Sequence, residues 1–74
     1  MSTTIKLELT SRGFTRGEFI DSFGEKCSIQ KSSLATEDCI WLGCDEGPNR
    51  MHLTRDMAAN LVVHIQRFVE TGNL

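Results

Sequence analysis

The 74-residue chain has no apolar run that approaches the roughly 20 residues of a membrane-spanning helix. It also has no concentration of basic residues, because its eight Lys and Arg are interspersed with ten Asp and Glu. A protein that holds duplex DNA without regard to sequence needs a concentrated basic surface to displace counterions. The sequence therefore argues against a membrane protein and against direct nucleic-acid binding.

The three cysteines, Cys27, Cys39 and Cys44, form no CxxC pair, and no signal peptide is evident before them. An odd number of cysteines in such a chain is typical of reduced thiols in a cytoplasmic protein. Cys39 and Cys44 would face opposite sides of an extended segment, and His52 and His64 match no zinc-ligand spacing. We therefore expect no metal site and no cofactor.

Catalytic motifs are also missing. No carboxylate pair, nucleophile elbow or phosphate-binding loop can be identified, and the glycines of SFGEK and WLGC are isolated. Cys27 and His52 would be a thiol–imidazole pair, but strand alternation places them on opposite faces. We expect no catalytic residue and no enzyme activity.

The length fits a single domain over residues 1–74, close to the lower limit for independent folding. A core of this size supplies about 3–5 kcal/mol, so small chains depend on a disulfide, a metal or a partner subunit. Since the first two are disfavoured, we expect a homo-oligomer, most simply a homodimer.

Five segments have the pattern of strands, at residues 5–9, 14–21, 26–32, 39–44 and 50–53. Phe14 and Phe19 have opposite parity, so a bulge at Arg16 and Gly17 would be needed to bring both rings to one face. Residues 45–49, DEGPN, give a strong turn signal.

A helix is predicted over residues 55–70, with Thr54 as N-cap and Gly72 after its last turn. Its apolar stripe comprises Met57, Ala58, Leu61, Val62, Ile65, Phe68 and Val69. We predict an α+β fold, an antiparallel β-meander of four to five strands with the C-terminal helix packed across one face. The sheet residues expected against the stripe are Ile5, Leu7, Leu9, Cys27, Ile29, Ile40, Leu42, Met51 and Leu53.

The lone tryptophan lies in the apolar run Cys39–Cys44. If Ile40 and Leu42 face the helix, alternation sends Trp41 to the opposite, helix-free face. The same rule places on that face Ser28, Gln30, Ser32, Gly43, Arg50 and His52. Gly43 would allow a ligand or a second backbone to approach closely.

An acidic segment lies next to this run, because residues 35–49 contain four acidic and no basic side chains. Glu37 and Asp38 lie beside Trp41 in sequence and could oppose a basic groove on a partner. The predicted binding residues are therefore Trp41, Gln30, Ser28, Ser32, Arg50, His52, Glu37 and Asp38.

Two interpretations of this face remain open. In one, Trp41 packs inward or is shielded by a loop, and the hydroxyls only solvate an exposed sheet. In the other, a ligand or a protein covers the face, since Ile-Trp-Leu is apolar on both sides of its strand.

Several segments resemble a family of small uncharacterised proteins encoded by bacteriophages, prophages and their bacterial hosts. They are FID with Gly24, CSIQKSS at 27–33, IWLG at 40–43, RMHLT at 50–54 and RFVETG at 67–72. The likeness covers most of the chain from Phe14 onward. What it implies is context: small phage-encoded domains often inhibit host machinery, including defence systems such as CRISPR, by binding.

The leading hypothesis is a phage-type, non-catalytic inhibitor that docks on a host protein or protein complex in the host cytoplasm. An alternative is a sponge for a nucleotide signal, in which Trp41 stacks on a base, Ser28, Gln30 and Ser32 hydrogen-bond, and Arg50 or Arg12 meets phosphate. A third is a structural or regulatory homodimer that associates through the same face.

Overall fold

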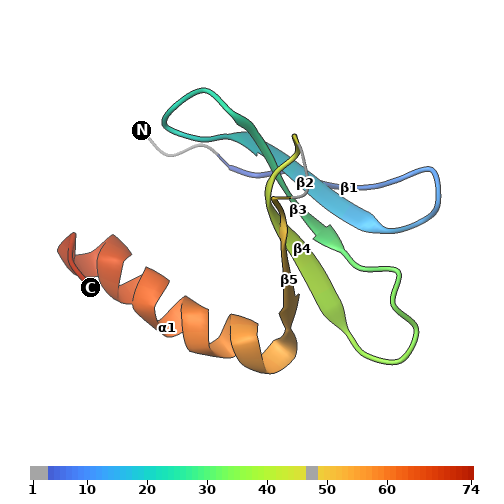
Figure 1. The fold of residues 1–74 in the computed structure, drawn as a ribbon. Helices are drawn as coiled ribbons and strands as arrows, with labels where there is room; N and C mark the ends of the chain where they lie inside the picture. The colour runs from blue at the N-terminus through green and yellow to red at the C-terminus, as the bar shows by residue number, and fades with distance from the viewer. Residues whose placement is uncertain (1–3, 47–48) are drawn as a thin grey trace.

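The computed structural model describes residues 4–46 and 49–74. Five strands precede one helix, and each strand pairs antiparallel with its neighbour in sequence (Figure 1). The strands are β1 (Leu7–Leu9), β2 (Thr15–Ile20), β3 (Lys26–Lys31), β4 (Cys39–Cys44) and β5 (Met51–Thr54). The predicted fold class, an α+β meander with a C-terminal helix, is confirmed. Gly47 and Pro48 of the predicted turn lie outside the described residues.

The strand register gives the sheet two chemically different faces. One row across all five strands pairs Glu8 with Arg16, Arg16 with Gln30, Gln30 with Trp41, and Trp41 with His52. The neighbouring row is apolar and faces the other way, because side chains alternate along each strand. That row consists of Leu7, Gly17, Ile29, Leu42 and Met51.

The bulge considered at Arg16 and Gly17 does not form, because β2 and β3 pair without interruption from Arg16 to Ile20. Gly17 instead makes room for the apolar row. A Cβ atom there would lie 2.8 Å from Ile5 Cγ2 and 2.8 Å from Leu7 Cδ2. The missing side chain therefore lets β1 lie close against β2.

The helix follows the last strand without a loop. Thr54 ends β5, and helix α1 (Arg55–Thr71) begins at the next residue, close to the predicted bounds. The Thr54 hydroxyl accepts a hydrogen bond from the Met57 backbone N–H at 3.2 Å, as an N-cap does. Gly72, at φ +75°, ends the helix, and its N–H donates to the Phe68 carbonyl at 2.7 Å.

The packing of the helix differs from the expectation. Its main contacts are with β5, and none of its residues is buried. In Figure 1, β5 and α1 form the two arms of a V. With no residues between strand and helix to reverse the chain, α1 leaves the sheet instead of lying across it. The apolar stripe is consequently open to solvent in the single chain.

The core is small. The buried apolar residues among those described are Cys27, Cys39 and Leu53. Ile5, Leu7, Leu9 and Met51, which were expected beneath the helix, are between 41% and 73% exposed. The described residues contain no helix with the length and hydropathy needed to cross a membrane.

A candidate binding face around Trp41

Trp41 lies at the centre of the polar face, between its register partners Gln30 and His52. Its ring centroid is 4.3 Å from that of His52, with the two planes tilted by 44°. The Arg50 guanidinium carbon lies 5.3 Å from the Trp41 centroid, within range of a cation–π contact. Four of the predicted binding residues are thus brought together, and Trp41 is half-buried.

The arginines of this face share one acceptor. Arg16 Nη1 and Arg50 Nη1 both donate to Gln30 Oε1, at 2.8 and 2.9 Å. Arg16 Nη2 also donates to Asp45 Oδ2 at 2.9 Å, forming an ion pair. Charge-assisted bonds of this kind are about twice as strong as neutral ones, so the network fixes these side chains.

The two predicted serines are placed differently from the other residues of the face. Ser28 is fully buried and donates to Asp45 Oδ1 at 2.6 Å. Ser32 is 5% exposed, and its Oγ lies 3.0 Å from His52 Nε2. Ser32 Oγ also accepts from the Leu34 backbone N–H at 3.2 Å. These two buried hydroxyls therefore bind Asp45, His52 and the backbone at Leu34 from beneath the surface of the single chain.

A pocket of about 180 Å³ opens beside Trp41. Its charged lining residues are Arg12, Lys31 and Arg50, of which Lys31 is paired with Asp38, and no carboxylate belongs to the described residues that line it. The other lining residues are Thr10, Ser11, Phe14, Gln30, Ser33 and Trp41. The pocket therefore combines positive charge, two aromatic rings and hydroxyl groups, which suits an anionic ligand with an aromatic part.

The two predicted acidic residues, Glu37 and Asp38, precede β4 and lie near the first residues of helix α1. Glu37 borders a hollow with Thr54, Arg55 and Asp56. Asp38 Oδ1 accepts from Lys31 Nζ at 3.1 Å. Both acids are exposed and neither lines the Trp41 pocket.

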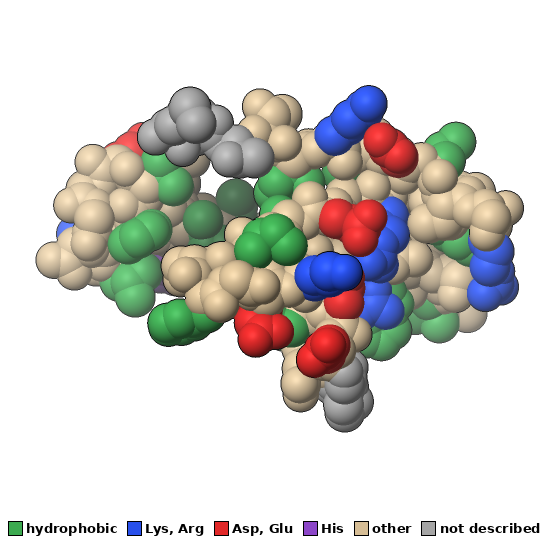
Figure 2. All heavy atoms as spheres, turned by 90° about the horizontal axis from the view of Figure 1, so that it is seen from above, with side chains coloured by type: hydrophobic (Ala, Val, Ile, Leu, Met, Phe, Trp, Pro, Cys, Tyr) green, Lys and Arg blue, Asp and Glu red, His purple; other side chains and the backbone are tan. Residues whose placement is uncertain are grey.

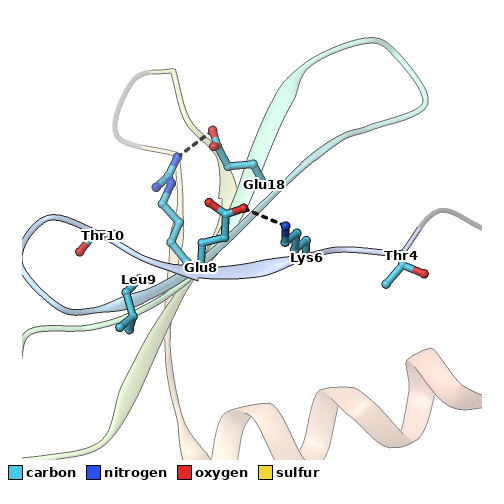
Figure 3. A pocket seen from close by; sticks show the side chains of 7 residues that line it. Thr4, Lys6, Glu8, Leu9, Thr10 and Glu18 are labelled. Carbon is cyan, nitrogen blue, oxygen red and sulfur yellow. Dashed lines mark ion pairs between the residues drawn. The ribbon is translucent and has the colours of Figure 1, made fainter.

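A larger and more open pocket lies on the outer strands (Figure 3). It is lined by opposite charges that pair along the strands, Lys6 with Glu8 at 3.6 Å and Arg16 with Glu18 at 3.7 Å. Exposed pairs of this kind contribute at most about 1 kcal/mol. Because these charges balance one another, this surface favours neither an anionic nor a cationic ligand.

Gly43 is approached by the chain itself. Its φ of +145° is unfavourable for other residues, and a Cβ atom there would lie 3.1 Å from Arg50 Cα and 3.1 Å from the Asn49 carbonyl oxygen. The close approach anticipated at this glycine is therefore made by the backbone that leads into β5. This approach positions Arg50 beside Trp41.

The fold brings together two cysteines whose proximity was not predicted from their spacing in the sequence. Cys27 and Cys44 are register partners with sulfurs 3.7 Å apart, and Asp21 completes a group whose ligand atoms lie within 4.8 Å of one another. Burial, the Cys44 thiol and nearby carboxylates raise the pKa of Cys27 to about 11. Because of this raised pKa, Cys27 stays a protonated, unreactive thiol at neutral pH. The form of cysteine that binds metals is the thiolate.

Sequence reasoning missed Arg16, Asp45 and Phe14 as parts of this face. Arg16 could have been identified from its position, because a cation inside a predicted strand needs a partner if the strand is half-buried. Asp45 lies 29 residues from Arg16 and had no such signal.

Comparisons of this chain with protein-family models, with curated proteins and with solved structures found no match.

Proposed function

We propose that this chain is a small non-catalytic binding protein that sequesters a nucleotide-type ligand against the polar face of its sheet. The observation that carries the proposal is the pocket beside Trp41. It is lined by the cationic residues Arg12 and Arg50, and by Lys31, whose ammonium group is paired with Asp38, and no carboxylate belongs to its described lining residues. Phosphate groups are bound by such clusters through charge-assisted hydrogen bonds.

The aromatic residues supply the second half of the recognition. Phe14 and Trp41 line the same pocket and offer flat apolar surface to a base. Stacking of a base on an aromatic side chain contributes about 1–3 kcal/mol and tolerates different bases. Gln30 adds hydrogen-bond donors for the base edge, because both arginines bind its oxygen and its amide nitrogen must point elsewhere.

The surrounding network supports binding rather than catalysis. Arg16, Asp45 and Ser28 are engaged with one another, so they hold the face rigid. A site whose polar groups are fixed in advance loses less entropy when a ligand binds. The pocket, at about 180 Å³, encloses only part of a nucleotide, and the rest would lie along the exposed Ser11 and Arg12.

The resemblance to phage-encoded proteins supports a biological setting for this activity. Sequestration of a nucleotide signal in the cytoplasm of an infected cell would silence a host response that depends on that signal. Such a protein needs no catalytic residue, only an affinity that matches the concentration of the signal.

The proposal is tested by binding of nucleotide fragments to the purified chain. Adenosine probes the aromatic surface, inorganic pyrophosphate probes the cations, and ADP and ADP-ribose combine both. Trp41 is the only tryptophan, so quenching of its fluorescence reports binding at this face. Binding also raises the melting temperature in proportion to the logarithm of ligand concentration.

We expect the combined ligands to bind more tightly than either fragment. Arg12→Ala should weaken pyrophosphate-containing ligands by about tenfold or more, the value of one charge-assisted hydrogen bond. Arg67→Ala removes the same charge from the outer side of the helix and should leave affinity unchanged. Equal loss in both variants, or no quenching by any ligand, contradicts the proposal.

A second candidate function is docking on a host protein, and a different observation favours it. Trp41, Arg50 and the exposed His52 form one contiguous cluster, and tryptophan and arginine are enriched among residues that dominate binding energy at interfaces. Exposed Glu37 would add negative charge at the margin, where charges mainly accelerate association. In this function the chain inhibits its target by covering it.

The two candidates differ in one experiment. Wild-type and Trp41→Ala chains, each tagged, are incubated with a bacterial lysate, and bound material is analysed by native mass spectrometry. A captured small molecule lost from the variant supports sequestration. A captured protein lost from the variant, with no response of the melting temperature to nucleotides, supports docking.

A further inference from the structure

A single copy of this chain exposes more surface than a folded chain of its size should. Its solvent-accessible area is 6226 Å². A compact monomer of 8.3 kDa exposes about 4,600 Å². Its radius of gyration of 13.3 Å likewise exceeds the value of about 11 Å expected for its length. About 1,600 Å² per chain is therefore left uncovered.

Exposed apolar side chains on two elements contribute to this surface. On α1, the stripe residues Met57, Leu61, Val62, Ile65, Phe68 and Val69 are between 39% and 70% exposed. On the sheet, the apolar row begins with exposed Leu7 and ends with exposed Met51. Figure 2 shows the space between them as a hollow, with hydrophobic side chains on its walls.

The helix is on the side of the apolar row. A small apolar pocket at the junction is lined by Ile40 and Leu53 of the sheet and by Ala58 of the helix. The polar face around Trp41 points the other way, since Trp41 alternates with Ile40 and Leu42. The uncovered surface is thus separate from the candidate binding face.

The chain cannot close this hollow by itself. Thr54 pairs with Cys39 in the sheet and also caps the helix, so no residue is available as a loop. Connections between a strand and a helix packed on the same sheet take about 2–6 residues. Whatever covers the sheet face and the stripe must come from outside the chain.

We propose that the occupant is a second copy, and that two chains exchange helices so that each α1 packs on the apolar sheet face of its partner. Each chain presents one unpaired apolar helix and one unpaired apolar sheet face, so a two-fold axis satisfies both at once. Covering about 1,600 Å² on each of two chains gives about 3,200 Å² in total, within the range of permanent homodimers.

The interface is tested with the full-length chain. Sedimentation equilibrium should give twice the 8.3 kDa chain mass at micromolar concentration. A mixed dimer of isotope-labelled and unlabelled chains then identifies the contacts by filtered NMR. We expect intermolecular contacts between the Phe68 ring and the methyl groups of Leu7, Ile29 and Leu42.

Matched variants give an independent test. Ile65→Asp places a charge in the centre of the stripe, whereas Val63→Asp places it on the opposite side of the same helix, where Val63 is 65% exposed. We expect Ile65→Asp to be a monomer or unfolded, and Val63→Asp to remain a folded dimer.

Several results would overturn the proposal. A folded wild-type monomer is one, including a monomer that captures another protein on the stripe. A dimer whose filtered contacts join only the Trp41 faces, or only helix to helix, is another. If both variants dissociate alike, the stripe is not the interface. These outcomes do not depend on whether the Trp41 pocket binds a nucleotide.

Discussion

At the scale of single residues, the polar face is ordered by one amide oxygen. Gln30 Oε1 accepts from Arg16 and Arg50, and Arg50 in turn lies over Trp41. Two cations that would repel each other are held at fixed positions because they share this acceptor and because Asp45 pairs with Arg16. Of the two, Arg50 lines the pocket beside Trp41, so the fold fixes the position of this part of the pocket's positive charge.

Strand alternation was sufficient to predict that Gln30, Trp41 and His52 share one face. It could not predict that Ser28 and Ser32 are buried there, since burial depends on what covers a strand as well as on which way its side chains point. Nor could it bring Cys27 and Cys44 together, because register between strands is set by the whole sheet.

The Cys27 thiol provides a prediction about pH. Its pKa is raised from 9.0 to about 11 in the fold, by burial first and then by Cys44 and nearby carboxylates. The unfolded chain therefore loses this proton at lower pH than the folded chain does. The stabilising contribution is complete below pH 9 and is lost as pH rises from 9 to 11. Urea unfolding across this range should show the decline.

Cys27→Ser supplies the comparison, because a serine hydroxyl does not titrate in this range. We expect its unfolding free energy to fall less steeply than that of the wild type between pH 9 and 11. Cys39→Ser, at another buried cysteine, should keep the wild-type slope. A Cys27→Ser variant with an unchanged slope shows that this thiol is not the group responsible.

At the scale of elements, the sequence was sufficient to predict the number, order and approximate bounds of the strands and the helix. Period-two alternation and the cap residues Thr54 and Gly72 were the decisive signals. The direction of the helix was not predicted, although the sequence contained the reason. Thr54 follows the strand residue Leu53 directly, which leaves no loop for a turn back onto the sheet.

Gly43 gives a prediction at this scale, because it lets β4 lie against the segment that enters β5. Gly43→Ala requires an alanine at φ +145° and pushes its methyl group against Arg50 Cα and the Asn49 carbonyl. We expect a loss of about 2–5 kcal/mol in unfolding free energy, from backbone strain and overpacking together. Chemical denaturation monitored by circular dichroism measures it.

Gly24→Ala is the matched control. Gly24 also has a positive φ, +85°, but nothing lies within 4 Å of its added Cβ. It should cost only the left-handed backbone term, about 1–2 kcal/mol. Equal costs at both glycines would mean that the contact with the β5 entry contributes nothing.

At the scale of the whole molecule, the length of the chain predicts a small core but does not show what covers the exposed apolar surface. A small core was expected from the length, and the structure has few buried apolar residues. The outer strand β1 has three residues, with Lys6 immediately before it and Glu8 at its centre, and these two side chains are paired. A short, charged edge discourages sheet-to-sheet extension at β1, which agrees with the proposal that association uses the apolar face and the helix.

If folding is coupled to formation of the proposed dimer, the melting temperature depends on chain concentration. We expect about a 5 °C rise for each tenfold increase in chain concentration, because two chains unfold as one unit with the enthalpy of both. Differential scanning calorimetry from micromolar to millimolar concentration measures this. Ile65→Asp, if it remains folded, should melt at one temperature at every concentration, and the same independence in the wild type would refute coupled folding.

The loopless junction at Thr54 also determines what a longer variant of this chain would be. A few flexible residues inserted before Arg55 would act as a hinge, and the helix could then reach the sheet of its own chain. Intramolecular closure proceeds at an effective concentration far above that of a second molecule, so such a variant would favour a closed monomer. If the proposed dimer forms, the number of residues between β5 and α1 thus decides whether the helix covers the sheet of its own chain or that of a second copy.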